Sequence, residues 1–214
     1  MIKKNIRIEK TARYFVLGNS SASSVWFVCH GYAQLASYFI KNFEPLNDGH
    51  NMIVAPEGLH RFYWQGYSGR VVASWMTRED RLDDIRDYVN YLDEVQREVM
   101  KEFAGKKVKV NVLGFSQGVA TACRWLSSGK TKADNLIMWS GVFPEDLDPG
   151  NEKNILQSTK VHSLVGTRDE FIDEPQRMKM KIFLDRNAPG HTFTLFDGKH
   201  EIPAGVLEAL ASSL

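Results

Sequence analysis

The sequence has almost no net charge, no long hydrophobic run and little cysteine. Its 27 Lys and Arg side chains and 26 Asp and Glu side chains leave a net charge of +1 over 214 residues, which gives no bulk attraction to nucleic acid or to an anionic membrane surface. No apolar run is long enough to span a membrane, and the N-terminal MIKKNIRIEK lacks the apolar stretch of a signal peptide. We therefore expect a cytoplasmic protein with no nucleic-acid partner and no stable membrane association.

The two cysteines, Cys29 and Cys123, fall in an expected strand and an expected helix, where buried free thiols are common. A disulfide is not expected in the cytosol, and no cysteine, histidine or carboxylate cluster has metal-ligand spacing. We therefore expect two core thiols, no metal and no organic cofactor. The alternative for Cys29, which lies beside the site described below, is sensitivity to thiol reagents.

The chain also lacks Pro-, Gly- or Ser-rich linkers, repeats and low-complexity tracts. Its 43% hydrophobic and 25% charged residues are ordinary for a globular protein. A chain of 214 residues is long enough for a sizeable core. We expect one domain, residues 1–214.

Seven short apolar runs have the character of buried strands, and helical patterns separate several of them. The runs are residues 14–17, 25–29, 52–55, 108–114, 136–140, 161–166 and 192–196. Helices are expected over residues 79–103, after Ser116, over residues 174–187 and from Pro203 onward. Near-continuous apolar strands that alternate with helices favour a mostly parallel sheet covered on both faces. The predicted fold class is therefore α/β, with three layers.

The connection between residues 55 and 79 is much longer than the usual βα loop. It is rich in aromatic side chains, namely Phe62, Tyr63, Trp64, Tyr67 and Trp75. Long ordered loops in compact domains are often functional, and aromatic residues in them either line a pocket or pin the loop to the body. Both interpretations stay open at this point.

The stretch VNVLGFSQGVATACRWL, residues 110–126, places Ser116 between Gly114 and Gly118, where a strand is expected to pass into a helix. Side chains at the two glycine positions would press on the neighbouring strand and helix in a strained turn. In an open parallel sheet, ligands bind beyond the carboxyl ends of the strands. The pattern therefore predicts that Ser116 is a nucleophile, and the alternative is that it is only a helix N-cap.

A serine nucleophile requires a base, and the base requires an acid that orients it. Among six histidines, His200 follows the last expected strand in a loop flanked by Gly198, and we predict that it is the base. Asp169, just after the expected strand that ends at residue 166, is the predicted acid. The alternatives for the acid are Asp173 and Asp197.

The chain order Ser116, Asp169, His200 is that of α/β hydrolases, and the sequence resembles the phospholipase/carboxylesterase family of small α/β hydrolases, which includes acyl-protein thioesterases. The resemblance extends over nearly the whole chain. It is carried by FVCHGYAQLASYF, VAPEG, LGFSQGVATA, WSGVFP, GTRDEFI and DGKHEI, of which GFSQG is the most characteristic. Residues 59–78 match the family only loosely.

The resemblance implies an α/β-hydrolase fold without a large cap domain and a serine esterase mechanism. In that mechanism His200 takes the proton of Ser116, Asp169 orients His200, and backbone N–H groups of Tyr32 and Gln117 hold the oxyanion. The expected substrate is a small carboxylic ester, or a thioester, with a short to medium acyl chain. We expect the substrate-binding walls to include Leu35, Phe62, Tyr63, Trp64, Trp75, Met76, Trp139 and Phe143.

Two other functions are compatible with the same triad and scaffold. An acyltransferase uses the same triad, and a noncatalytic binding protein can keep a hydrolase scaffold. Serine, acid and histidine at three matching strand ends favour an enzyme over a binding protein. A homodimer is compatible with the sequence.

Overall fold

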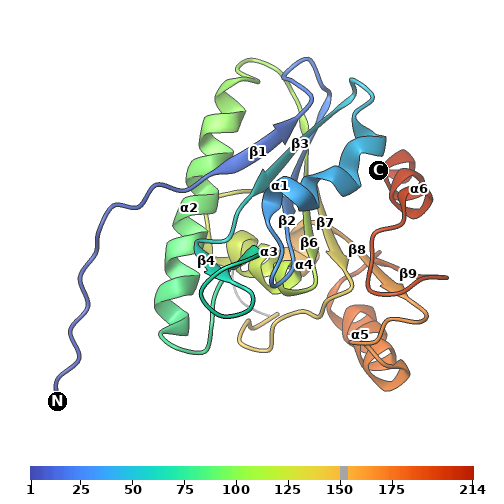
Figure 1. Ribbon diagram of the computed structural model, residues 1–214. Helices are drawn as coiled ribbons and strands as arrows, with labels where there is room; N and C mark the ends of the chain where they lie inside the picture. Colours follow the sequence, from blue (N-terminus) through green and yellow to red (C-terminus); the bar gives the residue numbers. More distant parts are fainter. Residues whose placement is uncertain (150–153) are drawn as a thin grey trace.

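The computed structural model describes residues 1–149 and 154–214, and a seven-stranded sheet runs through its centre (Figure 1). The strand order is β1-β3-β2-β6-β7-β8-β9; β1 is antiparallel to β3, and every other neighbouring pair is parallel. The strands are β1 (Tyr14–Leu17), β2 (Ser24–Cys29), β3 (Asn51–Pro56), β6 (Lys109–Phe115), β7 (Asn135–Trp139), β8 (Lys160–Gly166) and β9 (Thr192–Phe196). The predicted mostly parallel sheet is confirmed, and each expected run forms one of its strands.

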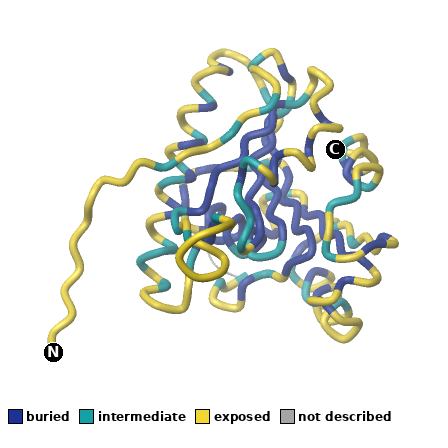
Figure 2. Tube along the Cα trace, in the orientation of Figure 1, coloured by how far each residue is buried: buried dark blue, intermediate teal, exposed yellow. Residues whose placement is uncertain are grey.

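Both faces of the sheet are apolar because helices cover both. Along β2, Val25 and Phe27 belong to one core cluster, whereas Trp26 and Val28 belong to the other. Successive side chains of a strand point to opposite faces, so a strand between two cores must be apolar at every position. Figure 2 shows the buried residues concentrated along the central strands.

The helices divide between the two faces of the sheet. On one face pack α2 (Arg81–Lys101), α3 (Gln117–Ser128), α4 (Ile155–Ser158) and α5 (Glu174–Asn187). On the other pack α1 (Ala36–Phe39), the 3-10 helix η1 (Ile40–Leu46) and α6 (Ala204–Ser213). The four expected helices are confirmed, whereas α1, η1 and α4 were not expected. Within residues 1–149 and 154–214, no helix is long and apolar enough to cross a membrane.

The resemblance implies a fold without a large cap domain, and the connection between β7 and β8 is too short to form a separate helical cap. Its described parts, residues 140–149 and 154–159, contain α4 as their one helix, of four residues. Residues 150–153 lie outside the described residues, so the expectation is met only in the parts of this connection that the structure describes.

The long connection after β3 is a β-hairpin rather than an irregular loop. Its strands β4 (His60–Tyr63) and β5 (Val71–Ser74) pair antiparallel with each other, separately from the main sheet. Backbone hydrogen bonds from Ala33 to Ala73 and between Ala73 and Gln34 attach the hairpin to the segment that follows β2. The hairpin therefore lies against the segment that carries His30 and Gly31.

Candidate active site

Ser116 stands on a sharp turn between β6 and α3. Its backbone has φ 55° and ψ −118°, a positive-φ conformation that residues other than glycine rarely adopt. Two backbone hydrogen bonds hold the turn: the N–H of Ser116 donates to Trp139 of β7 at 2.9 Å, and the N–H of Val119 donates to Ser116 at 3.0 Å. The Ser116 side chain makes no N-cap hydrogen bond. The cap interpretation of Ser116 therefore has no contact to support it, and the hydroxyl is free of that role.

The two glycines of GFSQG are required by close backbone approaches. A Cβ at Gly114 would lie 2.2 Å from the carbonyl oxygen of Gly118, and a Cβ at Gly118 would lie 2.1 Å from that of Cys29. Neither contact can be relieved by moving a flexible side chain, because both atoms belong to the backbone. The glycines let α3 start directly against β2 and β6, which fixes where Ser116 points.

The acid loop after β8 and the histidine loop after β9 are joined side by side. The N–H of Arg168 donates to the carbonyl of Gly198 at 2.9 Å, and the N–H of Thr167 donates to Phe196 at 2.8 Å. Across this junction the Nδ1 of His200 lies 2.8 Å from the Oδ2 of Asp169. The Asp169 side chain is fully buried and that of His200 is 13% exposed. The pairing of these two loops brings the predicted acid to the predicted base.

The two alternative acids have other partners. Asp173 is the N-cap of α5, where its carboxylate accepts from the N–H of Gln176 at 2.8 Å and completes a capping box. Asp197 is exposed and forms an ion pair with Arg168 at 2.8 Å. Asp169 is therefore the acid that contacts His200.

The His200 imidazole contacts two aromatic rings. Its centroid is 4.8 Å from that of Phe115, the residue before Ser116, and 4.7 Å from that of Phe171. The contact with Phe115 brings the imidazole next to the Ser116 turn. Phe171 was missed in the sequence, because a single aromatic residue among the charged residues of GTRDEFI follows no hydrophobic pattern.

Two further histidines are buried and structural. Burial lowers the pKa of His30 to about 4, so its ring is neutral at pH 7. Its Nδ1 lies 2.7 Å from the carbonyl oxygen of Gly31, and its Nε2 lies 2.9 Å from the N–H of Gly58. The ring thus donates through Nδ1, accepts at Nε2 and joins the segment after β2 to the turn after β3. Burial also lowers the pKa of His162, within β8, to about 4.

The segment after β2 lies directly beside the nucleophile turn. A Cβ on Gly31 would be 3.3 Å from the Cβ of Ser116. The next residue, Tyr32, has a backbone N–H for which no described residue acts as acceptor. Gln117 is the first residue of α3, and its N–H has no acceptor within its own helix. These are the two N–H groups that the sequence predicted for an oxyanion hole.

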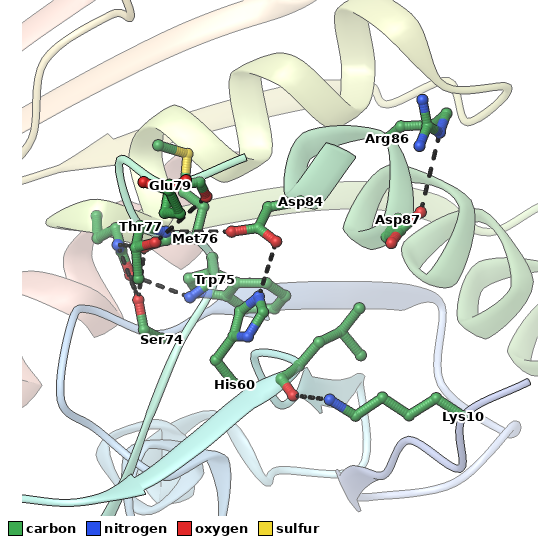
Figure 3. Close-up of polar contacts among 12 residues, drawn as sticks. Lys10, His60, Ser74, Trp75, Met76, Thr77, Glu79, Asp84, Arg86 and Asp87 are labelled. Carbon is green, nitrogen blue, oxygen red and sulfur yellow. Dashed lines mark hydrogen bonds and ion pairs between the residues drawn. The ribbon is translucent and has the colours of Figure 1, made fainter. Parts of the chain in front are cut away.

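The Gln117 side chain attaches the end of the hairpin to α3. Its Oε1 accepts from the N–H of Trp75 at 3.3 Å, and its Nε2 donates to the hydroxyl of Ser74 at 3.1 Å and to the carbonyl of Met76 at 3.2 Å. Figure 3 shows the segment Ser74 to Met76 that these bonds hold. A glutamine after the nucleophile therefore has a structural reason: it holds Ser74, the last residue of β5, and the two residues that follow it.

The hairpin is also attached to α2. The Nε2 of His60 lies 3.1 Å from the Oδ1 of Asp84, whose Oδ2 accepts from the N–H of Thr77 at 3.2 Å. Figure 3 shows His60 directed at Asp84. Through Asp84, the contacts of His60 and Thr77 brace the hairpin and the segment after it against α2.

The eight predicted wall residues have different environments. Trp75 and Trp139 are fully buried, and their indole N–H groups donate to the backbone carbonyls of His30 at 2.8 Å and of Glu201 at 2.9 Å, respectively. These two tryptophans are core residues, which corrects their expected place at a pocket wall. Phe143 is half-buried and stacks on Phe183 of α5 at 5.1 Å.

The other five predicted wall residues reach the surface. Tyr63 and Trp64 are 47% and 49% exposed, at the end of β4 and just beyond it. Half-buried are Leu35, Phe62 and Met76. The hairpin and the segment after β2 therefore supply the exposed and half-buried wall residues. Trp139, at the end of β7, and Trp75, just after β5, do not line the site.

Among the residues that the structure describes, no three His, Cys, Asp or Glu side chains are arranged to hold a metal ion. The chemistry available at this site is that of a hydroxyl, an imidazole, a buried carboxylate and backbone N–H groups.

The chain matches one protein family and resembles solved structures of esterases and of a thioesterase. The family described as "Serine hydrolase (FSH1)" matches residues 27–208, and no curated protein matches the chain. Similar solved structures include those of esterase PE8 (17% identity, TM-score 0.71, covering 95% of this chain and 99% of that chain), Zea mays acyl-protein thioesterase 2 (13%, 0.72, 95% and 97%) and the Bacillus cereus carboxylesterase (16%, 0.65, 94% and 92%). At these identities the likeness concerns the fold, and the predicted α/β-hydrolase fold is confirmed.

Proposed function

The chain belongs to the serine hydrolase (FSH1) family, and we propose that it hydrolyses carboxylic esters, and also thioesters, through an acyl-enzyme on Ser116. The observation that carries the proposal is the 2.8 Å contact between His200 Nδ1 and Asp169 Oδ2, on loops that meet beside the Ser116 turn. A buried carboxylate in this position holds the imidazole in one tautomer and stabilises the imidazolium.

The contact with Asp169 determines which nitrogen of His200 carries the proton. Nδ1 carries the proton that is donated to Asp169, which leaves the lone pair of His200 on Nε2. Nε2 accepts the proton of Ser116 as Oγ attacks the acyl carbonyl, and it returns that proton to the departing alcohol or thiol. Water then loses a proton to Nε2 as it attacks the acyl-enzyme, and Nε2 gives that proton to Oγ as the bond between Oγ and the acyl group breaks, which releases the acid and restores Ser116.

The oxyanion needs donors that are already in position. The N–H groups of Tyr32 and Gln117 flank Ser116 from two different segments, and their lack of described backbone acceptors leaves them available. Preorganised donors of this kind typically contribute about 10²- to 10³-fold each to kcat.

The site favours short to medium acyl chains. Leu35 and Phe62 are half-buried and Trp64 is half-exposed, and we expect residues of this exposure to line a shallow site rather than an enclosed tunnel. Each fully buried CH₂ contributes about 0.8 kcal/mol, and a long chain would leave its distal CH₂ groups in water here. Lengthening the acyl chain should therefore raise kcat/KM only for the first few added CH₂ groups.

The test is a panel of p-nitrophenyl esters and acyl-thioesters from acetyl to palmitoyl, assayed with the wild type and with Ser116→Ala. We expect kcat/KM to be larger for butyryl than for palmitoyl substrates and to vanish in Ser116→Ala, whose fold is checked by circular dichroism. Addition of alcohol or amine acceptors separates the alternatives: transfer to the acceptor in preference to water would indicate an acyltransferase. Hydrolysis that persists in Ser116→Ala would overturn the proposal.

A further inference from the structure

Two sets of aromatic side chains at the surface lie beside the proposed reacting groups. Phe171 is 66% exposed, and Tyr32 and Trp64 are 52% and 49% exposed. Large apolar side chains that gather at the surface around a site often contact a ligand. They lie on separate segments: Phe171 follows β8, Tyr32 follows β2 and Trp64 follows β4.

Phe171 lies on the side of His200. Its ring centroid is 4.7 Å from the imidazole at an interplanar angle of 66°, and its backbone N–H donates to the Oδ1 of Asp169 at 2.9 Å. The acid loop thus fixes the Phe171 backbone, and the imidazole contacts one part of its ring. The remaining two thirds of this apolar side chain face solvent next to the base.

Tyr32 lies on the side of Ser116. It follows Gly31, whose added Cβ would be 3.3 Å from the Cβ of Ser116. The Tyr32 ring packs against two rings of the hairpin, with centroids 5.9 Å from Phe62 and 6.0 Å from Trp64. These contacts fix the tyrosine ring and extend it into a wall of three aromatic rings that begins next to the nucleophile.

We infer that the site selects esters that carry an aryl ring, which binds against Phe171 or against the wall of Tyr32, Phe62 and Trp64; this rests on the proposed function. Aromatic rings attract each other in offset and edge-to-face geometries through their quadrupoles, beyond the burial of apolar area. A cyclohexyl ring of similar size gains the burial but not the quadrupole attraction. For one ring contact this difference corresponds to roughly 2- to 12-fold in kcat/KM.

The test compares matched ester pairs with nearly equal size and leaving-group chemistry. Benzyl butyrate against cyclohexylmethyl butyrate examines the alcohol part, and ethyl phenylacetate against ethyl cyclohexylacetate examines the acyl part. For the wild type we expect the aryl member of at least one pair to have the larger kcat/KM, by roughly 2- to 12-fold. The pair that shows the preference identifies which part of the ester carries the ring.

Leucine variants locate the aromatic contact. Phe171→Leu and Trp64→Leu keep an apolar side chain and remove the ring, so at least one of them should bring the aryl-to-cyclohexyl ratio of kcat/KM close to one. Tyr67→Leu is the control, because Tyr67 is 99% exposed on the same hairpin and should leave the ratio unchanged. The ratio is the readout because a general loss of His200 positioning lowers both members of a pair equally.

The outcomes separate this inference from the proposed function. Hydrolysis of all four esters with ratios near one in the wild type would overturn the aryl selectivity and leave the esterase proposal standing. If the wild type prefers aryl esters and both leucine variants keep that preference, neither Phe171 nor the wall of Tyr32, Phe62 and Trp64 binds the aryl ring. Failure to hydrolyse any of the four esters, together with no labelling by a fluorophosphonate, would overturn both proposals.

Discussion

The carboxylate of Asp169 is held from two directions. Its Oδ2 lies 2.8 Å from the Nδ1 of His200, and its Oδ1 accepts from the backbone N–H of Phe171 at 2.9 Å. Because the side chain is fully buried, these two donors replace water and fix the orientation of the carboxylate. The imidazole it contacts is therefore oriented as well, with Nε2 left for the reaction.

The first prediction concerns the identity of the acid. Asp169→Asn should lower kcat/KM for ester hydrolysis by about 10⁴-fold, as the wrong tautomer does in the well-studied serine triad. Asp173→Asn is the matched control, because Asp173 caps α5; asparagine is also a good N-cap, so both activity and stability should stay near those of the wild type. A larger loss of activity in Asp173→Asn would show that the acid is misassigned.

The second prediction concerns the glycines of the nucleophile turn. In Gly114→Ala the new Cβ would meet a backbone oxygen at 2.2 Å, so the free energy of unfolding should fall by at least about 2 kcal/mol. Gly205→Ala is the control, since its Cβ would meet nothing within 4 Å; in α6 it should stabilise by about 0.5–1 kcal/mol. Urea denaturation measures both. Equal stabilities for the two variants would contradict the close packing of β6 on α3.

The third prediction concerns pH and stability. Burial lowers the pKa of His30 from 6.5 to about 4 in the folded protein, so the unfolded chain binds a proton first as the pH falls. The stabilisation that comes from keeping His30 neutral is fully present above pH 6.5 and is lost as the pH falls toward 4. For one histidine, the free energy of unfolding decreases by about 3 kcal/mol over this range.

Urea denaturation at pH 7 and pH 5 measures this loss. The decrease in the free energy of unfolding should be smaller in His30→Gln than in the wild type, and also smaller in His162→Gln, whose pKa burial lowers to about 4. The exposed His50 supplies the control variant His50→Gln, which should behave as the wild type does. Identical pH dependence in all four proteins would be inconsistent with buried neutral histidines.

The fourth prediction concerns the thiols. Cys29 and Cys123 are fully buried, and burial raises the pKa of Cys123 to about 12 and that of Cys29 as well. The thiolate is the reactive form, so neither residue should react with a thiol-specific disulfide reagent in the native protein, and esterase activity should survive the treatment. Both thiols should react after denaturation in urea. Rapid native labelling of Cys29 would instead support the alternative of a reagent-sensitive site.

Much of the fold could be predicted because the sheet is covered on both sides. Double burial makes the central strands near-continuous apolar runs, and these runs, together with the partly exposed edge strands β1 and β9, were all recognised. The hairpin was not: β4 and β5 have four residues each, and the stretch between them carries no two-residue turn signal of the Asn-Gly kind. Its attachment to the body is made by contacts with Gln34 and Gln117, which are distant in sequence.

For the site, sequence reasoning identified residue types at strand ends but not which side chains face outward. Trp75 and Trp139 are the residue types expected at pocket walls, yet both side chains are fully buried, and their indole N–H groups donate to backbone carbonyls. Asp169 and Asp173 are close in sequence, and only the meeting of the acid and histidine loops separates the His200 partner from a helix cap. Phe171 is recognised as a site residue only from its contact with His200 in the structure. The two residues lie on different loops, and the hydrophobic periodicity of the sequence does not predict contacts between loops.

The central claim is that Ser116 is a nucleophile, and reaction with a fluorophosphonate followed by peptide mass spectrometry tests it most directly. The wild type should gain one phosphonyl group, located on the peptide that contains Ser116, and folded Ser116→Ala should gain none. An unmodified wild type under conditions in which it hydrolyses esters, or equal modification of Ser116→Ala, would contradict the account.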